Sequence, residues 1–274
     1  MRDLPLPSLI ARSTLSRLVH RILVGRVFHR YFRIVPADTQ GLREEVFRIR
    51  YDVYCQELKW EDPGAFPAGM ERDGYDAQSL HTLLLHRQSG DYVGCVRLVR
   101  VDPARTNAPL PFERACEGGL YKHVLERARI DRLRIGEISR LAVRARFRRR
   151  AGEQNVAEGV VPERGESAGA RKSPPIAMGL YLAAAASGLM TGLDGVFALM
   201  EPRLAKRLKS HGITFEQVGE PIEHRGLRAP FYITREELYA NIPPLARGLL
   251  DVVLHDLRSA RGWGPLTSAS QRET

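Results

Sequence analysis

The spacing of apolar positions changes repeatedly along the chain and predicts alternating helices and strands. Within 41–55, apolar residues recur every three or four positions, which is typical of one helical face. Apolar runs at 81–86 and 92–101, separated by Ser89-Gly90-Asp91, predict a β-hairpin. Further strands are predicted at 136–143, 195–200, 215–218 and 229–234, and further helices at 112–127, 176–193, 201–211 and 235–258, the last broken near Pro243-Pro244.

This order of elements predicts a mixed α/β fold. The 274 residues, 43% of them hydrophobic, suit a single domain with extensions and a sizeable core. Neither a GxGxxG pattern nor a Walker loop follows a predicted strand, which argues against dinucleotide-binding and nucleoside-triphosphatase folds. We assign the domain to residues 37–258.

Residues 1–36 form a basic amphipathic extension. Seven arginines and two aspartates occur in residues 1–40, and apolar residues alternate with the arginines at helical spacing over 8–34. Such a helix has two interpretations: it lies in an anionic membrane interface, or it packs on its own domain with the arginines in water.

The composition changes after the predicted strand 136–143. Residues 144–175 contain eight basic residues, four glutamates and few large apolar side chains, so we expect an exposed insertion. Residues 259–274 are expected to be a flexible tail.

The overall composition excludes several classes of protein. The three cysteines lack CxxC spacing and the eight histidines lack ligand spacing, which predicts no metal site and no disulfide framework. No run of 18 apolar residues is free of charge, so no membrane-spanning helix is expected.

The net charge of +10 favours an acidic partner or surface. Outside enzymes, the alternatives are a basic nucleic-acid-binding module and a peripheral membrane-binding module. No zinc, helix-turn-helix or aromatic sheet motif supports the first, and we expect no nucleic acid as partner. Cysteine usage favours a reducing, cytoplasmic location, with association at the inner face of the membrane if the basic helix binds lipid.

Four short segments concentrate charged residues that are hard to explain as part of an apolar core. Arg50 and Tyr54 share a helical face, and an arginine among apolar neighbours requires a carboxylate partner. The acidic run 71–76 supplies candidates, and the other two segments are strands that carry Arg97 and Glu137.

Together these segments resemble the acyl-homoserine-lactone (autoinducer) synthases and the related N-acyl amino acid synthases. The matching pieces occur in order: Arg50-x-x-x-Tyr54, Trp60, Glu71-x-Asp73-Gly74-Tyr75-Asp76, Gly94-Cys95-x-Arg97-Leu98 and Glu137-Ile138-Ser139-Arg140-Leu141. The resemblance implies the acyltransferase fold of the GCN-five-related N-acetyltransferases (GNAT), with a mixed, mostly antiparallel sheet flanked by helices. It also implies transfer of a fatty acyl group from a thioester to an amine.

The long extension, the insertion and the C-terminal part resemble most the acyltransferases of PEP-CTERM/exosortase systems, regarded as N-acyl amino acid synthases. This favours an amino acid or related small molecule as the acceptor. S-adenosylmethionine, as in homoserine-lactone synthesis, and an acetyl-CoA-dependent N-acetyltransferase remain the alternatives. We expect no permanently bound cofactor, and acyl carrier protein (ACP, a phosphopantetheine thioester) or acyl-CoA as co-substrate.

The residues receive the following expected roles. An ammonium must lose a proton before it can attack a thioester, and Glu137 is the candidate base, with Arg97 as its catalytic partner. The residues expected to bind the acceptor are Arg50, Tyr54, Trp60, Asp73, Asp76 and Arg140. The residues expected to dock an acidic carrier protein are Arg144, Arg146, Arg148, Arg149 and Arg150.

Overall fold

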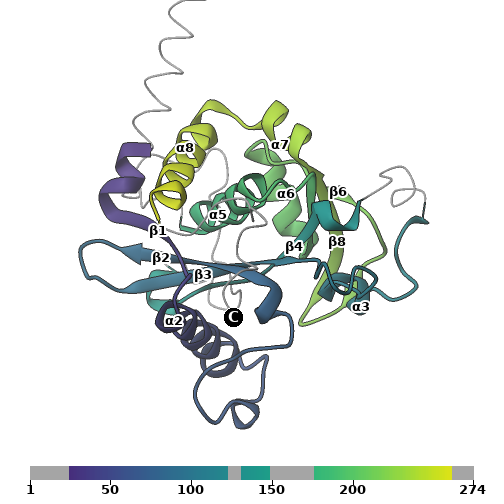
Figure 1. Ribbon diagram of the computed structural model, residues 1–274, viewed down its shortest axis with the longest axis horizontal. Helices are drawn as coiled ribbons and strands as arrows, with labels where there is room; N and C mark the ends of the chain where they lie inside the picture. The colour runs from purple at the N-terminus through teal and green to yellow at the C-terminus, as the bar shows by residue number, and fades with distance from the viewer. Residues whose placement is uncertain (1–24, 123–130, 149–175, 261–274) are drawn as a thin grey trace, which may run out of the picture.

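An eight-stranded sheet forms the centre of the protein. The computed structural model describes residues 25–122, 131–148 and 176–260. The strands follow the order β1-β2-β3-β4-β5-β8-β6, with β7 paired to β8, and every pair is antiparallel except β4–β5 (Figure 1). The strands are β1 (Phe32–Pro36), β2 (Ser79–His86), β3 (Tyr92–Arg100), β4 (Ile135–Val143), β5 (Gly195–Met200), β6 (Glu216–Gln217), β7 (Ile222–Glu223) and β8 (Leu227–Thr234).

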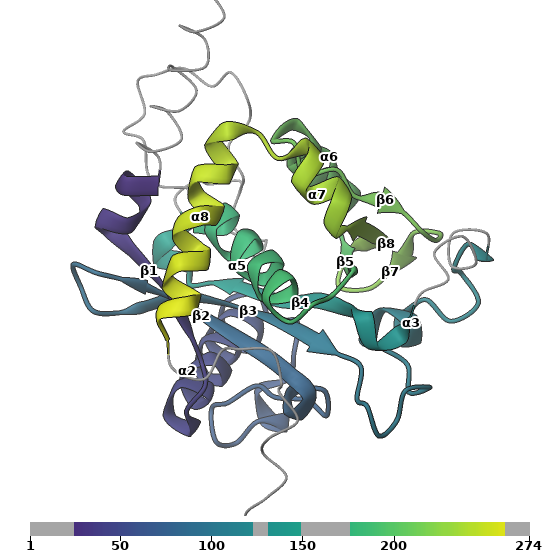
Figure 2. The same cartoon turned by 45° about the horizontal axis from the view of Figure 1, so that its top comes forward.

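Helices cover both faces of the sheet. On one face, α2 (Gln40–Tyr51) begins at the capping hydroxyl of Thr39 and continues as a π-helical turn, Asp52–Glu57. On the other face, α5 (Ile176–Met190) and α8 (Pro244–Ser259) lie side by side, with α6 (Pro202–Ser210) and α7 (Arg235–Asn241) toward β8 (Figures 1 and 2). The short α3 (Pro111–Ala115) lies near the end of β5.

Small residues let α5 approach the sheet closely. The helix is apolar all round and rich in alanine and glycine, and it contacts β2, β3, β4 and β5 on one side and α8 on the other. In β3, a Cβ added to Gly94 would lie 2.7 Å from the carbonyl oxygen of Ala142 and 3.0 Å from Leu180 of α5. Glycine at this position is therefore a packing requirement.

The sheet splits between β4 and β5, and this split positions the site. The parallel pairing runs only from Ile135↔Gly195 to Ile138↔Ala198, and no described pairing joins the later residues of the two strands. On its other edge β4 bulges against β3, where Arg140 adopts a left-handed φ of 52°. The bulge bends β4 away from β5 and leaves a gap that side chains line.

Most of the predicted elements are confirmed, and three predictions need correction. The helix predicted over 112–127 is interrupted after Ala115, where Gly118 adopts a left-handed φ of 78°, and its residues from 123 onward lie outside the described part of the chain. The N-terminal helix ends at residue 31, because buried Phe32 and Ile34 alternate with exposed Arg33 and form β1. The insertion does not begin at residue 144: Arg144 is half-buried and Arg148 is buried.

The remaining parts of these predictions fall outside the described residues, namely most of the extension 1–36, the insertion from residue 149 and the tail from residue 261. In the described part of the chain, no helix is long and apolar enough to span a membrane.

The close packing of α5 predicts the effect of one substitution. Gly94→Ala should destabilise the protein by about 1–3 kcal/mol, because the added methyl group meets a backbone oxygen that cannot move away. Urea denaturation measures this change. Gly41→Ala is the matched control: nothing lies near its Cβ position in α2, so helix propensity should raise stability by about 0.5–1 kcal/mol. Equal effects at the two positions would contradict the packing argument.

Candidate active site

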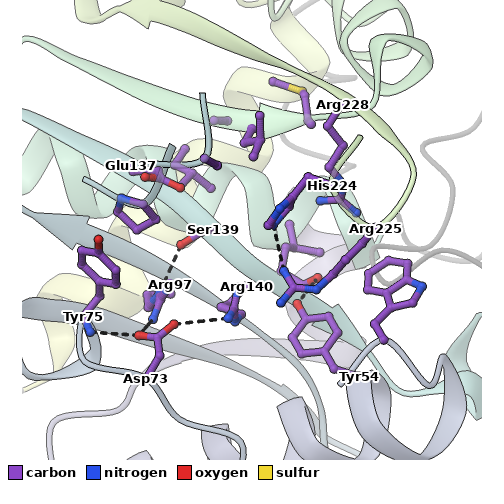
Figure 3. A pocket seen from close by; sticks show the side chains of 18 of the residues that line it. Tyr54, Asp73, Tyr75, Arg97, Glu137, Ser139, Arg140, His224, Arg225 and Arg228 are labelled. Carbon is purple, nitrogen blue, oxygen red and sulfur yellow. Dashed lines mark hydrogen bonds and ion pairs between the residues drawn. The ribbon is translucent and has the colours of Figure 1, made fainter. Parts of the chain in front are cut away.

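A cavity of about 320 Å³ lies at the gap between β4 and β5. Its walls come from segments far apart in the chain: the turn after α2, the loop before β2, the strands β3, β4 and β5, and the β7–β8 hairpin (Figure 3). The polar and aromatic residues that line it include Tyr54, Trp60, Asp73, Tyr75, Arg97, Glu137, Ser139, Arg140, His224, Arg225 and Arg228.

Arg50 holds two carboxylates of the acidic run 71–76 beneath this cavity. Its side chain is fully buried, and its guanidinium is paired with Glu71 and, at 2.6 Å, with Asp76. Neither Arg50 nor Asp76 is among the residues that line the cavity. The structure therefore places both behind the wall, although they were expected to bind substrate directly.

Two further arginines complete this ion-pair network. Arg97 Nη1 lies 2.6 Å from Asp73 and 2.8 Å from Asp76, and its Nε donates to Ser139 Oγ at 3.1 Å. Arg140 lies 3.2 Å from Asp73 and 3.2 Å from Glu71. Three arginines thus face three carboxylates, and the charges of the network balance.

The arginines keep the carboxylates ionised. Burial alone would raise the pKa of Asp76, but the charge and hydrogen bond of Arg50, joined by Arg97, hold it well below its usual range. The pKa values of Glu71 and Asp73 are lowered in the same way against the effect of burial, chiefly by Arg50 and Arg97 respectively. At neutral pH the network therefore carries full charges that cancel.

Glu137 faces the same cavity in a different environment. Only 2% of the residue is exposed, and its Oε2 accepts a hydrogen bond of 2.7 Å from the backbone N–H of Phe112. Burial raises its pKa to about 8, although this hydrogen bond and the charges of Arg97 and Arg140 oppose the shift. Glu137 thus holds a proton at neutral pH and ionises slightly above it, which suits a group that exchanges protons.

Two aromatic rings form a further wall. Tyr54 and Trp60 stack with ring centroids 5.9 Å apart and an interplanar angle of 13°. The Tyr54 hydroxyl donates to the carbonyl oxygen of Leu141 at 3.1 Å, which ties the turn after α2 to β4. The guanidinium of Arg140 lies 5.8 Å from the ring of Tyr54. Both aromatic residues therefore line the cavity.

The β7–β8 hairpin supplies three lining residues that the sequence analysis missed. Arg225 occupies the turn with a left-handed φ of 54°, paired with Glu61 and 3.0 Å from His224 Nε2. Burial, with the charges of Arg225 and Arg228, lowers the pKa of His224 to about 4, so this imidazole is neutral at pH 7. The basic run His-Arg-Gly-Leu-Arg was a usable signal, but nothing in sequence placed this turn beside segments more than 80 residues away.

A second, apolar cavity of about 40 Å³ adjoins the first. The two share Ile138, Tyr181 and Phe215 as lining residues. Its other walls are apolar side chains of α5, β5, α6 and α7, among them Leu189, Val196, Leu208 and Leu238. The helix α5 and the strand β5 therefore border an apolar space that adjoins the larger cavity.

The arginines expected to dock a carrier protein lie in different surroundings. Arg144 pairs with Glu45 and Asp52, and Arg148 pairs with Glu57. Arg146 is largely exposed and lies 3.1 Å from Asp91, whereas residues 149 and 150 are outside the described part of the chain. Arg144 and Arg148 thus fix the end of β4 against the segment of α2 and its π-helical turn.

The chain is similar to known acyltransferases in sequence and fold. A family profile described as acetyltransferase (GNAT) domain matches residues 49–157. An acyl-homoserine-lactone synthase of Pseudomonas fluorescens is 22% identical over 179 residues, which cover 65% of this chain and 72% of that protein.

Two solved structures are similar in fold. MesI, a CoA-dependent acyl-homoserine lactone synthase, has a TM-score of 0.50 and 22% identity, with 82% of this chain and 95% of its own covered. FeeM, an N-acyl amino acid synthase from uncultured soil microbes, has a TM-score of 0.50 and 13% identity, with 77% and 94% covered. The GNAT fold predicted from the sequence is confirmed, and the protein is an acyltransferase.

The buried ion pairs predict a strong dependence of stability on Asp76. Asp76→Asn should lower the free energy of unfolding at pH 7 by about 3–5 kcal/mol, because it leaves Arg50 and Arg97 incompletely paired. The folded pKa of Asp76 is depressed, so its contribution is present above the ordinary value of 3.8 and is lost as the pH falls below it.

Chemical denaturation between pH 3 and 7 should therefore show that the difference in the free energy of unfolding between parent and variant becomes smaller as the pH falls. Asp194→Asn is the matched control, since the pair of Asp194 with Arg134 is about half exposed and should contribute less than about 1 kcal/mol. A gap for Asp76→Asn that is constant down to pH 3 would contradict the linkage.

Proposed function

We propose that this acyltransferase is an N-acyl amino acid synthase, which moves a fatty acyl group from a thioester to the amine of an amino acid or related small molecule. The observation that carries the proposal is the position of Glu137, a buried carboxyl that lines the larger, polar cavity next to Ile138, which lines both cavities. The FeeM fold and the acyl-homoserine-lactone synthases among the similar proteins support the same class of reaction.

In the proposed reaction, Glu137 in its ionised form accepts a proton from the acceptor's ammonium, directly or through a water molecule. The neutral amine nitrogen then attacks the thioester carbonyl carbon, and a tetrahedral intermediate forms. Backbone N–H groups of β4, beyond the point where its described pairing with β5 ends, supply donors for the oxyanion. The C–S bond breaks, the amide remains, and the thiolate leaves and takes up a proton.

Asp73 and the aromatic wall orient the acceptor in this proposal. Asp73 is the one carboxylate of the ion-pair network that lines the cavity, with 27% of its side chain exposed. It can hold the acceptor's ammonium, while Trp60 and Tyr54 cover the rest of the acceptor. Arg50 and Asp76 act from behind by fixing Arg97 and Asp73, and Arg97 acts with Glu137 by lowering the cost of its ionisation.

The acyl chain occupies the second cavity, whose apolar walls favour a fatty chain over an acetyl group. For the donor we propose an acyl carrier protein, with acyl-CoA as the alternative because MesI is CoA-dependent. Homoserine-lactone synthesis from S-adenosylmethionine is the alternative reaction, in line with the Pseudomonas fluorescens relative. Association with a PEP-CTERM/exosortase system and with the inner face of the membrane extends the proposal and rests on the sequence alone.

The carrier protein would dock on α6. This helix carries Arg203, Lys206 and Lys209 on its exposed side, and none of them forms an ion pair with a described residue. Leu204 of the same helix lines the larger cavity and Leu208 lines the smaller one. A strongly acidic carrier bound there would place its thioester close to both cavities.

Glu137→Gln tests the chemistry. In cells that express the parent protein, lipid-extract mass spectrometry should detect new N-acyl amino acids, which should fall by about 10²–10⁴-fold with Glu137→Gln if general-base catalysis is lost. In vitro, kcat/KM of the parent should rise through pH 8, because the carboxyl must be ionised to act and its pKa is about 8. In Glu137→Gln, kcat/KM should not rise around pH 8, and only the increase caused by deprotonation of the acceptor amine should remain. Equal product from parent and variant would contradict the assignment of the base.

Charge reversal tests the docking surface. Replacing Arg203 and Lys206 by glutamate should raise KM for an acyl-ACP about tenfold, because steering toward an acidic partner is lost. KM for the matching acyl-CoA should stay unchanged. Arg146→Glu, an exposed charge beyond β4, is the control. An increase in KM only with Arg146→Glu would instead support docking at the arginine run that begins at residue 144.

A further inference from the structure

The cavity has an unbalanced positive charge on one wall. In Figure 3, His224, Arg225 and Arg228 of the β7–β8 hairpin lie on the side opposite Asp73 and Arg97. The charges of the ion-pair network beneath cancel. On the hairpin wall Glu61 pairs with Arg225, but no described carboxylate pairs with Arg228.

Arg228 is held in place without its polar groups being satisfied. Its guanidinium lies 5.3 Å from the ring of Trp60, and the residue is half-buried. Its Nε is buried and has no hydrogen-bond partner among the described residues. A fixed guanidinium with an unused buried donor is suited to a planar anion, which accepts two parallel hydrogen bonds from it.

The neighbours of Arg228 do not compete for this role. The neutral ring of His224 accepts from Arg225, so it adds no further positive charge to the wall. Trp60 has a cation over its ring already, which disfavours a second cation there. The wall therefore distinguishes a negative ligand from a neutral or positive one.

We propose that Arg228, steadied by Trp60 and flanked by Arg225, binds the carboxylate of the acceptor and so selects amines that bear an anionic group. This inference rests on the proposed function and deepens it. The acceptor then spans the cavity, with its ammonium toward Asp73 and Glu137 and its carboxylate toward the hairpin. The buried Nη2 of Arg97 also lacks a hydrogen-bond partner among the described residues, so the assignment to Arg228 rests on its having no carboxylate partner there, whereas Arg97 is paired with Asp73 and Asp76.

Product analogues test this site without turnover. Isothermal titration calorimetry compares N-dodecanoylglycine with N-dodecanoylglycinamide, both below their critical micelle concentrations. The parent should bind the carboxylate about tenfold more tightly, the effect of about one charge-assisted hydrogen-bonded pair. Arg228→Gln should abolish this preference and leave the affinity for the amide unchanged. Equal binding of the two ligands by the parent, or a preference retained by the variant, would overturn the proposal.

Glu61→Gln gives a test of opposite sign that does not depend on the folding of Arg228→Gln. Removal of this carboxylate frees Arg225, so N-dodecanoylglycine should bind roughly threefold more tightly, the effect of a modest exposed pair. An unchanged or weaker affinity would count against the proposal. Arg258→Gln, an exposed arginine at the end of α8, is the matched control and should behave as the parent.

The donor's phosphates are the other source of an anion, and coenzyme A distinguishes it. If Arg228→Gln weakens binding of coenzyme A and not of N-dodecanoylglycine, the wall serves the donor and the proposal is wrong. Failure of the proposed function is separate: the parent would then form no N-acyl product in the mass-spectrometry experiment. Product formation without a carboxylate preference would refute only the site at Arg228.

Discussion

The balanced network of three arginines and three carboxylates is the interaction on which the site depends. It joins α2, the loop before β2, β3 and β4 through buried ion pairs. A buried network is costly unless every charge finds a partner, and here each carboxylate meets two guanidinium groups. Because the two members that reach the cavity from β3 and β4 are fixed from behind, their positions do not rely on a ligand.

Asp73 and Glu137 line the same cavity, but the pKa values of their carboxyl groups shift in opposite directions. Asp73 has arginine partners at hydrogen-bond distance and stays ionised, whereas Glu137 has a single backbone donor and a raised pKa. Asp73 lies in the loop before β2, where Arg97 and Arg140 both reach it, whereas Glu137 lies on β4 and faces the backbone N–H of Phe112.

The sequence predicted the sheet and most of the site because local patterns and ordered motifs carry that information. Apolar runs marked β2, β3, β4 and β5, and the acidic run before β2 correctly supplied the partners of Arg50. It could not separate residues in the cavity from residues behind it, as with Arg50, because depth depends on tertiary packing. Arg228 was also overlooked in the sequence analysis, because its hairpin and Trp60 are far apart in the chain and come into contact only in the folded protein. In β1, a two-residue alternation of only five positions was hidden within a longer helical pattern.

The smaller cavity shares its walls with the main core. Leu208 and Leu238 border it and also belong to the cluster that packs α5 and α8 on the sheet. Truncation of such a residue to alanine typically costs about 2–5 kcal/mol. The same side chains therefore determine both the size of the smaller cavity and the stability of the fold. Enlarging this cavity by truncating Leu208 or Leu238 would therefore also remove packing from the core.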